Sequence, residues 1–416
     1  MRILIISNIF PPDFIGGYEL MAFDVASEFA ARGHEVLVAT SPLMTALKPE
    51  LNSSLRVARV LHGVSLSVEP DRHDHFSYGV CINLRNLATL NDLLIGFNPD
   101  SIYCFNLTGL GAAGLLWFLI KSGYKPIVHL ADNIFAQWEL DHPDRFDRFS
   151  SYFGLEVLAD GVSWIAMSDT VWRQVVGSLA ITPPNVTFVP GWVRHRFEVD
   201  KNATIRSADG LSKFVFASRV APHKGIHLVL DAAKELLNRG ETQFIIDVYG
   251  AGEVAEWTQR ASAQHVDQHV FFKGAVKKDD LITTFQQYDA LLFPTWEREP
   301  FGLVAAEAAM QGCIPIMTQS MGASEWFLDG KDCIKIPRES PALAFAIQKI
   351  ISMDVESKSK LSEAMKWTSR SMFSFDNWYP TLEEIAIRSR RALPLDAERQ
   401  RRIFGATCAL TRLWRE

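Results

Sequence analysis

The sequence lacks the cysteine patterns that mark disulfide-rich and zinc-binding proteins. Its 416 residues include five cysteines, an odd number, and none stands in a CxxC pair or at Cys/His metal-ligand spacing. A disulfide framework is therefore not indicated, and we expect the thiols to serve as small core residues in a reducing cytoplasm. The five positions are Cys81, Cys104, Cys313, Cys333 and Cys408.

Long hydrophobic runs are also missing. The apolar stretch at residues 107–120 contains glycines and is shorter than the roughly 20 residues that span a bilayer, so we expect a buried helix there. The N-terminal run MRILIIS begins like a signal peptide but ends at Asn8 and the Pro11-Pro12 pair. We interpret it as a first buried strand.

There is no excess of positive charge. Lysine and arginine total 42 against 48 acidic residues, a net charge of -6, which argues against nucleic acid as the main partner. Hydrophobic residues make up 48% and charged residues 22%, so the chain can bury a large core, and its length favours two domains.

What the sequence does contain is an alternation of short β-branched runs and amphipathic segments. This pattern predicts an α/β fold with two doubly wound parallel sheets, joined near the polar stretch at residues 198–212. Ligands of such sheets bind outside the carboxyl ends of the strands, and two facing domains would enclose a cleft there. The expected strands are RILIIS, EVLVATS, SIYCFN, PIVHLA, WIAMS and VTFVP, then KFVFASR, QFIIDVYG, HVFFKG, ALLFPT and CIPIMTQ.

Several candidate binding residues follow these strands. After the first strand, Gly16 and Gly17 would let backbone N–H groups approach a phosphate or sugar near a helix N-terminus, although an ordinary turn explains them equally well. They are not part of a GxGxxG motif, so a nicotinamide cofactor is not indicated. Gly250 and Gly274 follow later strands and are weaker donor-site candidates.

Two cations follow the first strand of the second domain. Arg219 comes directly after the strand and Lys224 five residues later, before Gly225 and an apolar helix. A pair of cations at the end of a strand suits a diphosphate, and the alternative is a solvated basic turn.

The segment EREPFGLVAAE places Glu299 in a loop and Glu307 in a helix that ends near Gly312. On one continuous helix, eight residues would turn the second carboxylate about 80° past two full turns, so the loop is needed for both to face one cleft. Each carboxylate can accept hydrogen bonds from two hydroxyls, and helix N–H groups between them would face a negative charge. Solvated positions are the alternative, but the apolar neighbours of Glu307 argue against it.

With these residues the sequence resembles glycosyltransferase family 4, the retaining GT-B enzymes with an E-x7-E motif, over nearly its whole length. The motif is formed by Glu299 and Glu307. Further matching pieces occur in the expected order: PPDFIGGYE, ARGHEVLVATS, IAMSDTV, VPGWVRHRF, SRVAPHKG, YGAGE, FKGAV and MGASEWFLDG.

The resemblance implies specific roles around a nucleoside-diphosphate-sugar donor. Arg219 and Lys224 would hold the diphosphate, Glu307 the ribose hydroxyls and Glu299 the transferred sugar. Other donor contacts would come from Gly16, Gly17, Phe301, Gly302, Leu303 and the strand end at Gly274. No metal ion or other cofactor is expected, because these cations and a helix dipole can offset the leaving charge. The segment from His73 to His75 could bind a metal ion, but a solvated loop is the better interpretation of it.

Two positions depart from the family pattern. The family often has a His-Asp pair after the strand that corresponds to PIVHLADN; Asp132 fits the aspartate, but Ala131 precedes it. Strand alternation points His129 the same way as Ala131, so His129 either substitutes from a deeper position or is a core histidine. The segment VPGWV stands where the family usually has Pro-Asn-Gly-Val, and its Trp192 either shapes the acceptor pocket or packs against the linker.

The implied domains are an acceptor-side domain at residues 1–195 and a donor-binding domain at residues 196–374. A helix at about 375–392 would cross back to the first domain. The tail at 393–416 is basic and amphipathic, so it either docks on protein or lies on an anionic membrane surface.

The predicted function is transfer of a hexose-type unit, with retention of configuration, to a glycan, lipid-linked or small-molecule acceptor. The enzyme would work in the cytoplasm, or peripherally at the inner face of a membrane. Two alternatives stay open: a GT-B sugar-nucleotide epimerase, and a non-catalytic sugar-nucleotide-binding protein that serves a partner enzyme. A phosphorylase would need a pyridoxal lysine, for which there is no candidate.

Overall fold

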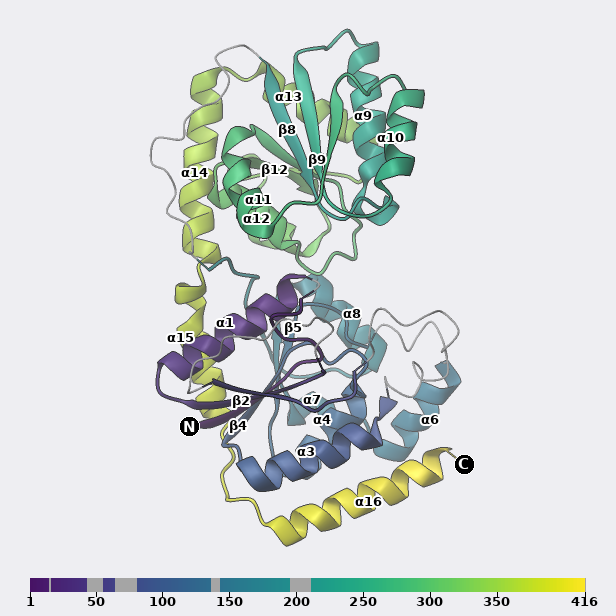
Figure 1. Cartoon of the computed structure of the whole chain (residues 1–416), viewed down its shortest axis with the longest axis vertical. Helices are drawn as coiled ribbons and strands as arrows, with labels where there is room; N and C mark the ends of the chain where they lie inside the picture. Colours follow the sequence, from purple (N-terminus) through teal and green to yellow (C-terminus); the bar gives the residue numbers. More distant parts are fainter. Residues whose placement is uncertain (15, 43–54, 64–80, 136–142, 195–210, 416) are drawn as a thin grey trace. The chain divides into compact units, whose positions relative to one another are not determined.

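The computed structural model describes residues 1–14, 16–42, 55–63, 81–135, 143–194 and 211–415. The chain forms two compact units (Figure 1). Unit 1 comprises Met1–Val189 and Trp378–Glu416, and unit 2 comprises Pro190–Asn377. The chain thus passes from unit 1 to unit 2 slightly before the boundary at residue 195 that the sequence suggested, and His73 to His75 lie outside the described residues.

Unit 1 is built on a seven-stranded parallel sheet with the strand order β3-β2-β1-β4-β5-β6-β7. Its apolar runs form the predicted strands, whereas β3 was not predicted because it is a short edge strand with charged residues at Arg56 and Arg59. The strands are β1 (Arg2–Ile6), β2 (Glu35–Thr40), β3 (Leu55–Arg59), β4 (Ser101–Cys104), β5 (Ile127–Leu130), β6 (Ser163–Ala166) and β7 (Val186–Phe188).

Helices cover both faces of this sheet. Phe29 of α1 packs against Tyr103 of the sheet and Tyr379 of α15, which places α1 and α15 on one face. The apolar stretch at 107–120 supplies the buried helix α4, as predicted. The helices are α1 (Gly17–Ala31), α3 (Leu84–Phe97), α4 (Ala112–Lys121), α6 (Pro143–Phe153), α7 (Val157–Gly161), α8 (Asp169–Leu179), α15 (Phe375–Arg388) and α16 (Ala397–Arg415).

Unit 2 has a six-stranded parallel sheet with the order β10-β9-β8-β11-β12-β13. The first and fourth strands, β8 and β11, are neighbours, so the direction of winding reverses between them. The edge strand β13 was not predicted; it has three residues, one of which is the charged Lys335. The strands are β8 (Ser212–Ala217), β9 (Phe244–Tyr249), β10 (Val270–Gly274), β11 (Ala290–Phe293), β12 (Ile314–Thr318) and β13 (Ile334–Ile336).

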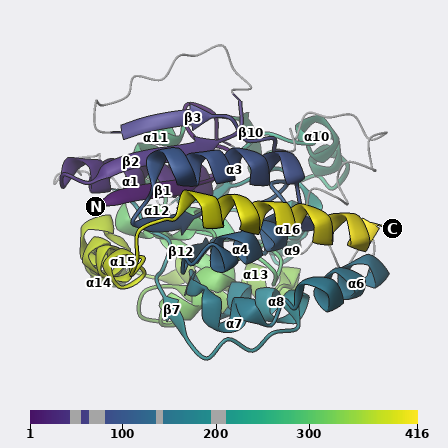
Figure 2. The same cartoon turned by 90° about the horizontal axis from the view of Figure 1, so that it is seen from below.

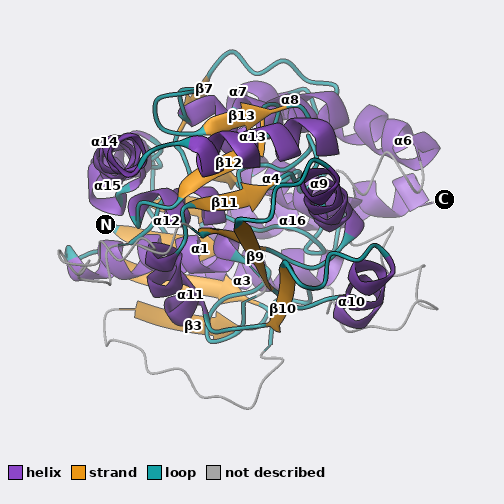
Figure 3. Ribbon diagram, turned by 90° about the horizontal axis from the view of Figure 1, so that it is seen from above, coloured by secondary structure: helices purple, strands orange, loops and turns teal. Residues whose placement is uncertain are grey.

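The helices of unit 2 also lie on both sides of its sheet (Figure 3). Helix α9 packs against α10 and α13, and α12 packs against α14. They are α9 (Ile226–Asn238), α10 (Val254–Ala263), α11 (Lys278–Thr284), α12 (Leu303–Met310), α13 (Ser340–Ser352) and α14 (Val355–Phe373), with short 3-10 turns η1 (Pro222–Lys224), η2 (Phe285–Gln287) and η3 (Gly322–Trp326). The prediction of two doubly wound sheets is confirmed.

The C-terminal helix α16 packs on unit 1 (Figure 2). It contacts α3, α4 and α6, and its inward residues recur every three or four positions. Trp414 is buried against Phe149 with ring centroids 5.1 Å apart, and the Gln400 amide donates to the Ser122 hydroxyl at 2.9 Å. The apolar face of the tail therefore docks on its own protein.

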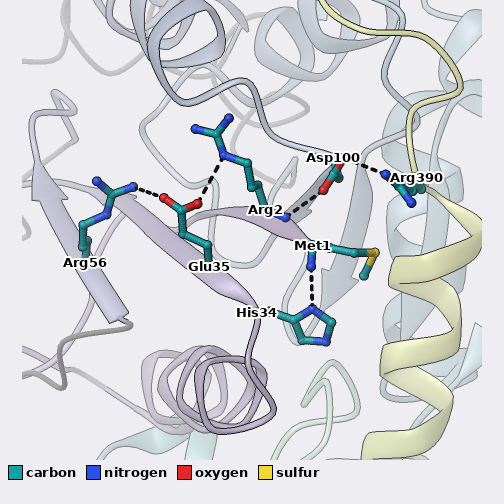
Figure 4. Close-up of polar contacts among 7 residues, drawn as sticks. All are labelled: Met1, Arg2, His34, Glu35, Arg56, Asp100 and Arg390. Carbon is teal, nitrogen blue, oxygen red and sulfur yellow. Dashed lines mark hydrogen bonds and ion pairs between the residues drawn. The ribbon is translucent and has the colours of Figure 1, made fainter.

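Polar contacts join the amino ends of the unit 1 strands (Figure 4). Glu35 pairs with Arg2 at 3.4 Å and with Arg56 at 2.7 Å, and Asp100 accepts from the Arg2 backbone and pairs with Arg390. The Met1 amino group lies 3.2 Å from His34 Nδ1. Exposed pairs of this kind contribute little stability each. They occupy the edge of the sheet opposite to the one where ligands of such folds bind.

The cysteines behave as the sequence indicated. Four of them are buried and Cys408 is partly exposed, and none of the five forms a disulfide in the described part of the chain. Burial raises the pKa of the Cys333 thiol to about 12, so it stays protonated near neutral pH. Among the helices of the described residues, none has the length and hydropathy required to span a bilayer.

Candidate functional site

Two loops of unit 2 meet where the winding of its sheet reverses. One follows β8 and carries Lys224, and the other follows β11 and carries Glu299. Because β8 and β11 pair directly, the loops are adjacent, and the Trp296 N–H donates to the His223 carbonyl at 2.9 Å. Reversal points of this kind are the usual ligand sites of doubly wound sheets.

The structure brings Lys224 and Glu299 together as an ion pair. Their side chains are only 18% and 12% exposed, so each charge depends on the other for compensation. The buried hydroxyl of Thr295 donates to the same Glu299 oxygen, Oε2, at 2.9 Å. Glu299 is thus held in a fixed orientation.

Further bonds fix the backbone of this loop. The Thr295 carbonyl accepts from the Thr318 hydroxyl at 2.7 Å, and the Glu299 carbonyl accepts from the Gly322 N–H at 2.9 Å. The ends of β11 and β12 are therefore tied together behind the carboxylate. A site held in this way needs little reorganisation when a ligand binds.

The site is rich in positive charge. Burial lowers the pKa of His223 most, and the nearby cations Lys224, Arg219 and Arg338 lower it further. Arg219 is exposed at the end of β8, whereas Arg338 follows β13 and donates from Nη2 to the carbonyls of Pro222 and His223 at 3.1 and 3.4 Å. Arg338 thereby holds the turn that carries Lys224.

Glu307 lies in the second half of the motif, on α12. The predicted division of the motif into a loop and a helix is confirmed, because α12 begins at Leu303. The Glu307 side chain is only 7% exposed, and its Oε1 lies 2.7 Å from the Nζ of Lys278 at the start of α11.

The residues between the two carboxylates have mainly packing roles. Phe301 is buried against Phe373 with ring centroids 5.9 Å apart, and its carbonyl accepts from the Ala323 N–H at 2.9 Å. Gly302 has a φ of +87°, and a Cβ there would lie 2.5 Å from Phe293, so glycine is required. Leu303, partly buried, is the first residue of α12.

The glycines after β9 and β10 position the loop that carries Arg219. A Cβ on Gly250 would lie 1.8 Å from the Ser218 carbonyl oxygen, so only glycine allows this close approach. The Gly250 N–H donates to the Gly274 carbonyl at 2.9 Å. The strand-end glycines thus support the site through the backbone.

In unit 1 the glycine pair forms the start of α1. Gly16 is the N-cap and Gly17 the first helical residue. The Gly16 N–H donates to the buried carboxylate of Glu19 at 3.0 Å, so the protein itself uses this group. The pair therefore has the geometry of an ordinary helix start, one of the two interpretations of these residues.

His129 belongs to the core of unit 1, which favours the core-histidine alternative over a role at the reacting sugar. Its side chain is fully buried, its ring stacks on Phe105 at 5.3 Å, and its Nδ1 lies 3.0 Å from the Tyr103 hydroxyl. Burial lowers its pKa to about 3, so the ring stays neutral. Asp132 is exposed just after β5 and accepts from the Asn133 N–H at 2.8 Å.

Two further predictions concern Trp192 and the absence of a metal site. Trp192 is buried and packs against Phe375 with ring centroids 5.2 Å apart, which favours linker packing over a role in an acceptor pocket. Within the described residues, no group of three or more histidines, cysteines and acidic residues is arranged to hold a metal ion.

Sequence reasoning missed Lys278, Thr295 and Arg338. Lys278 stands in the charged run KKDD and Arg338 in PRES, both of which are typical of solvated surface. Only the folded chain shows that each contacts a residue of the site. Lys278 and Arg338 come just after strands β10 and β13, and this position after a strand was the signal that could have identified them.

Comparison with known proteins relates this chain to glycosyltransferases. Residues 200–368, most of unit 2, match the family model described as glycosyl transferases group 1. The whole fold is that of GT-B glycosyltransferases.

Individual relatives extend over nearly the whole chain. A glycogen synthase of Mycobacterium tuberculosis is 22% identical over 94% of this chain and 95% of its own length. The solved sucrose-phosphate synthase of Thermosynechococcus elongatus has a TM-score of 0.71 and 16% identity, covering 93% of this chain and 98% of its own. The Anabaena protein Alr3699/HepE, solved with UDP and glucose, has a TM-score of 0.63 and 19% identity, covering 92% and 98%. These two structural matches show the fold.

Proposed function

We propose that the protein transfers a hexose-type unit from a nucleoside-diphosphate sugar to an acceptor hydroxyl, with retention of anomeric configuration. The observation that carries this proposal is the buried Lys224–Glu299 pair at the reversal point of the unit 2 sheet, with Glu307 on the adjoining helix. The match of unit 2 to glycosyl transferases group 1 supports it. UDP and glucose in the Anabaena relative support the donor class.

The charges of the site suit a departing diphosphate. In this proposal Arg219 and Lys224 bind the diphosphate oxygens, and the positive end of α12 adds to their effect. The negative charge that develops on the leaving group would then be stabilised without a metal ion. Arg338 acts indirectly, because it holds the turn that carries Lys224.

The two carboxylates take the hydroxyl-bearing parts of the donor. Glu299, oriented by Lys224 and Thr295, accepts hydrogen bonds from the transferred sugar and positions its ring. Glu307 accepts from the ribose hydroxyls. The diphosphate would lie between them, near the start of α12.

A screen of UDP-, GDP- and ADP-sugars tests the proposal. At a concentration of 100 times its Kd, a donor should stabilise the folded protein by about 2.7 kcal/mol, which appears as a rise in Tm. The corresponding free sugars serve as controls and should have no effect. If none of the nucleotide sugars stabilised the folded protein, the proposal would be contradicted.

The same screen separates the two alternatives. Incubation of the best donor alone, followed by product analysis, would expose an epimerase through a changed sugar. A panel of glycan and glycolipid acceptors would then be added. Transfer of the sugar supports the proposed function, whereas tight binding with neither transfer nor epimerisation supports a binding protein.

The acceptor is proposed to be a glycan or a lipid-linked glycan, with the enzyme in the cytoplasm or at the inner face of a membrane. The outward face of α16 carries exposed arginines, and its apolar face is covered by unit 1. Contact with a membrane would therefore be electrostatic and would not require insertion of the helix. These arginines are Arg399, Arg401, Arg402 and Arg412.

Replacing the four arginines with glutamine should weaken binding to vesicles that contain anionic lipid. At about 1 kcal/mol for each basic residue, the loss of affinity should be about a hundredfold or more. Cosedimentation of the full chain with vesicles measures it. Replacing exposed lysines of unit 2, Lys234 and Lys360, provides the control. If the arginine variant and the lysine variant bound the vesicles equally well, the arginines of α16 would not be the membrane-binding surface.

A further inference from the structure

The ion pair between Lys278 and Glu307 joins two helices of unit 2. Lys278 is the first residue of α11, and Glu307 lies on α12. The lysine Nζ is 2.7 Å from the carboxylate Oε1, and the lysine side chain is 37% exposed while that of Glu307 is 7% exposed. The partner of this buried carboxylate is thus open to solvent.

The carboxylate needs this lysine. An ionised carboxylate that is removed from water without compensation is strongly destabilised. Among the residues that the structure describes, Lys278 is the cation that contacts Glu307, and no hydrogen-bond donor of those residues reaches its side chain. The orientation of the Glu307 carboxylate therefore depends on Lys278.

The pair leaves room for a ligand on the carboxylate. Lys278 engages Oε1, and an ionised carboxylate has about four acceptor positions on its two oxygens. Two neighbouring hydroxyls can therefore still donate to Glu307 while the lysine stays in place. A vicinal diol is the group that matches this arrangement.

We propose that Lys278 is a positioning residue that holds Glu307 oriented toward the two ribose hydroxyls of the donor. It thereby sets the preference of the site for ribonucleotides over 2′-deoxyribonucleotides. The inference rests on the proposed function, and it assigns specificity to a lysine that contacts the nucleotide only through Glu307. A neutral residue at position 278 would leave the diphosphate site intact and remove the ribose preference.

Calorimetric titration of the full chain tests the proposal with UDP, GDP and ADP and their 2′-deoxy counterparts. In the unmodified protein, the nucleotide that binds best should bind about tenfold more tightly than its deoxy form, because a charged hydrogen bond is lost. In Lys278→Met, ribonucleotide affinity should fall about tenfold with deoxynucleotide affinity unchanged within about twofold. The preference should therefore disappear.

Two further variants separate positioning from general effects. Lys278→Arg keeps the positive charge and should retain most of the ribose preference. Lys277→Met removes the neighbouring exposed lysine at the N-cap of α11 and should bind both nucleotides like the unmodified protein. If Lys278→Met does not fold, Lys278→Gln replaces it.

Three results would overturn the inference while leaving the proposed transfer standing. They are an unchanged ribose preference in Lys278→Met, an equal loss for ribo- and deoxynucleotides, and no preference in the unmodified protein. Failure of the unmodified protein to bind any of the three nucleotides would overturn the proposed function as well.

Discussion

Replacement of Glu299 by glutamine is expected to lower the rate of sugar transfer by about a hundredfold or more. Glutamine has nearly the same shape and keeps an acceptor for Thr295, but it removes the charge that pairs with Lys224. Both the sugar-binding carboxylate and the orientation of the lysine are then lost. The measurement is kcat/KM with the donor and acceptor found by the screen.

A matched variant is available on the same loop. Glu297 is exposed two residues earlier, and Glu297→Gln should leave the rate within about twofold of the unmodified protein, as is usual for surface changes. Thermal unfolding of both variants shows whether the fold is intact. Retention of more than a tenth of the activity by folded Glu299→Gln would place the reacting centre elsewhere.

Replacement of Trp414 by alanine is expected to destabilise unit 1 by about 3 kcal/mol, because it removes a buried aromatic ring. Trp414 is only 4% exposed and packs edge to face on Phe149 of α6. Chemical denaturation followed separately for the two units should show a loss in unit 1 and no change in unit 2.

The neighbouring residue provides the comparison. Leu413 is 56% exposed, so Leu413→Ala should cost less than about 0.5 kcal/mol. A similar loss of unfolding free energy in Trp414→Ala and Leu413→Ala would mean that α16 is not packed as described. The result also bears on membrane experiments, because deleting α16 would uncover apolar surface of unit 1 and disturb its fold.

Most of the fold could be predicted because its central strands are continuous apolar runs. Parallel strands buried on both faces need such runs, and those of β1, β4, β8 and β11 are unmistakable in the sequence. The strands that were missed, β3 and β13, lie at sheet edges and contain charged residues, whereas the edge strands β7 and β10 kept apolar runs and were predicted. A strand at an edge can carry charges because it is not buried on all sides.

The site could be predicted only in part. Spacing after strands located Arg219, Lys224, Glu299 and Glu307, because strand ends meet at one edge of a sheet. Which residue pairs with each charge depends on how loops and helices pack, so the ion pair between Lys278 and Glu307 could not be predicted from the sequence. For His129 the sequence left two alternatives open, because strand alternation gives the direction of a side chain but not its depth of burial.

The docking of the C-terminal segment on unit 1 has a consequence for the order of folding. The Arg391 N–H donates to the Asp100 carbonyl at 2.8 Å, and α16 covers apolar helices made from the first half of the chain. Unit 2 is one continuous stretch and can fold when its own residues have been synthesised. Unit 1 is complete only after the residues of α16 have been synthesised, and until then α3 and α4 lack the cover that this helix provides.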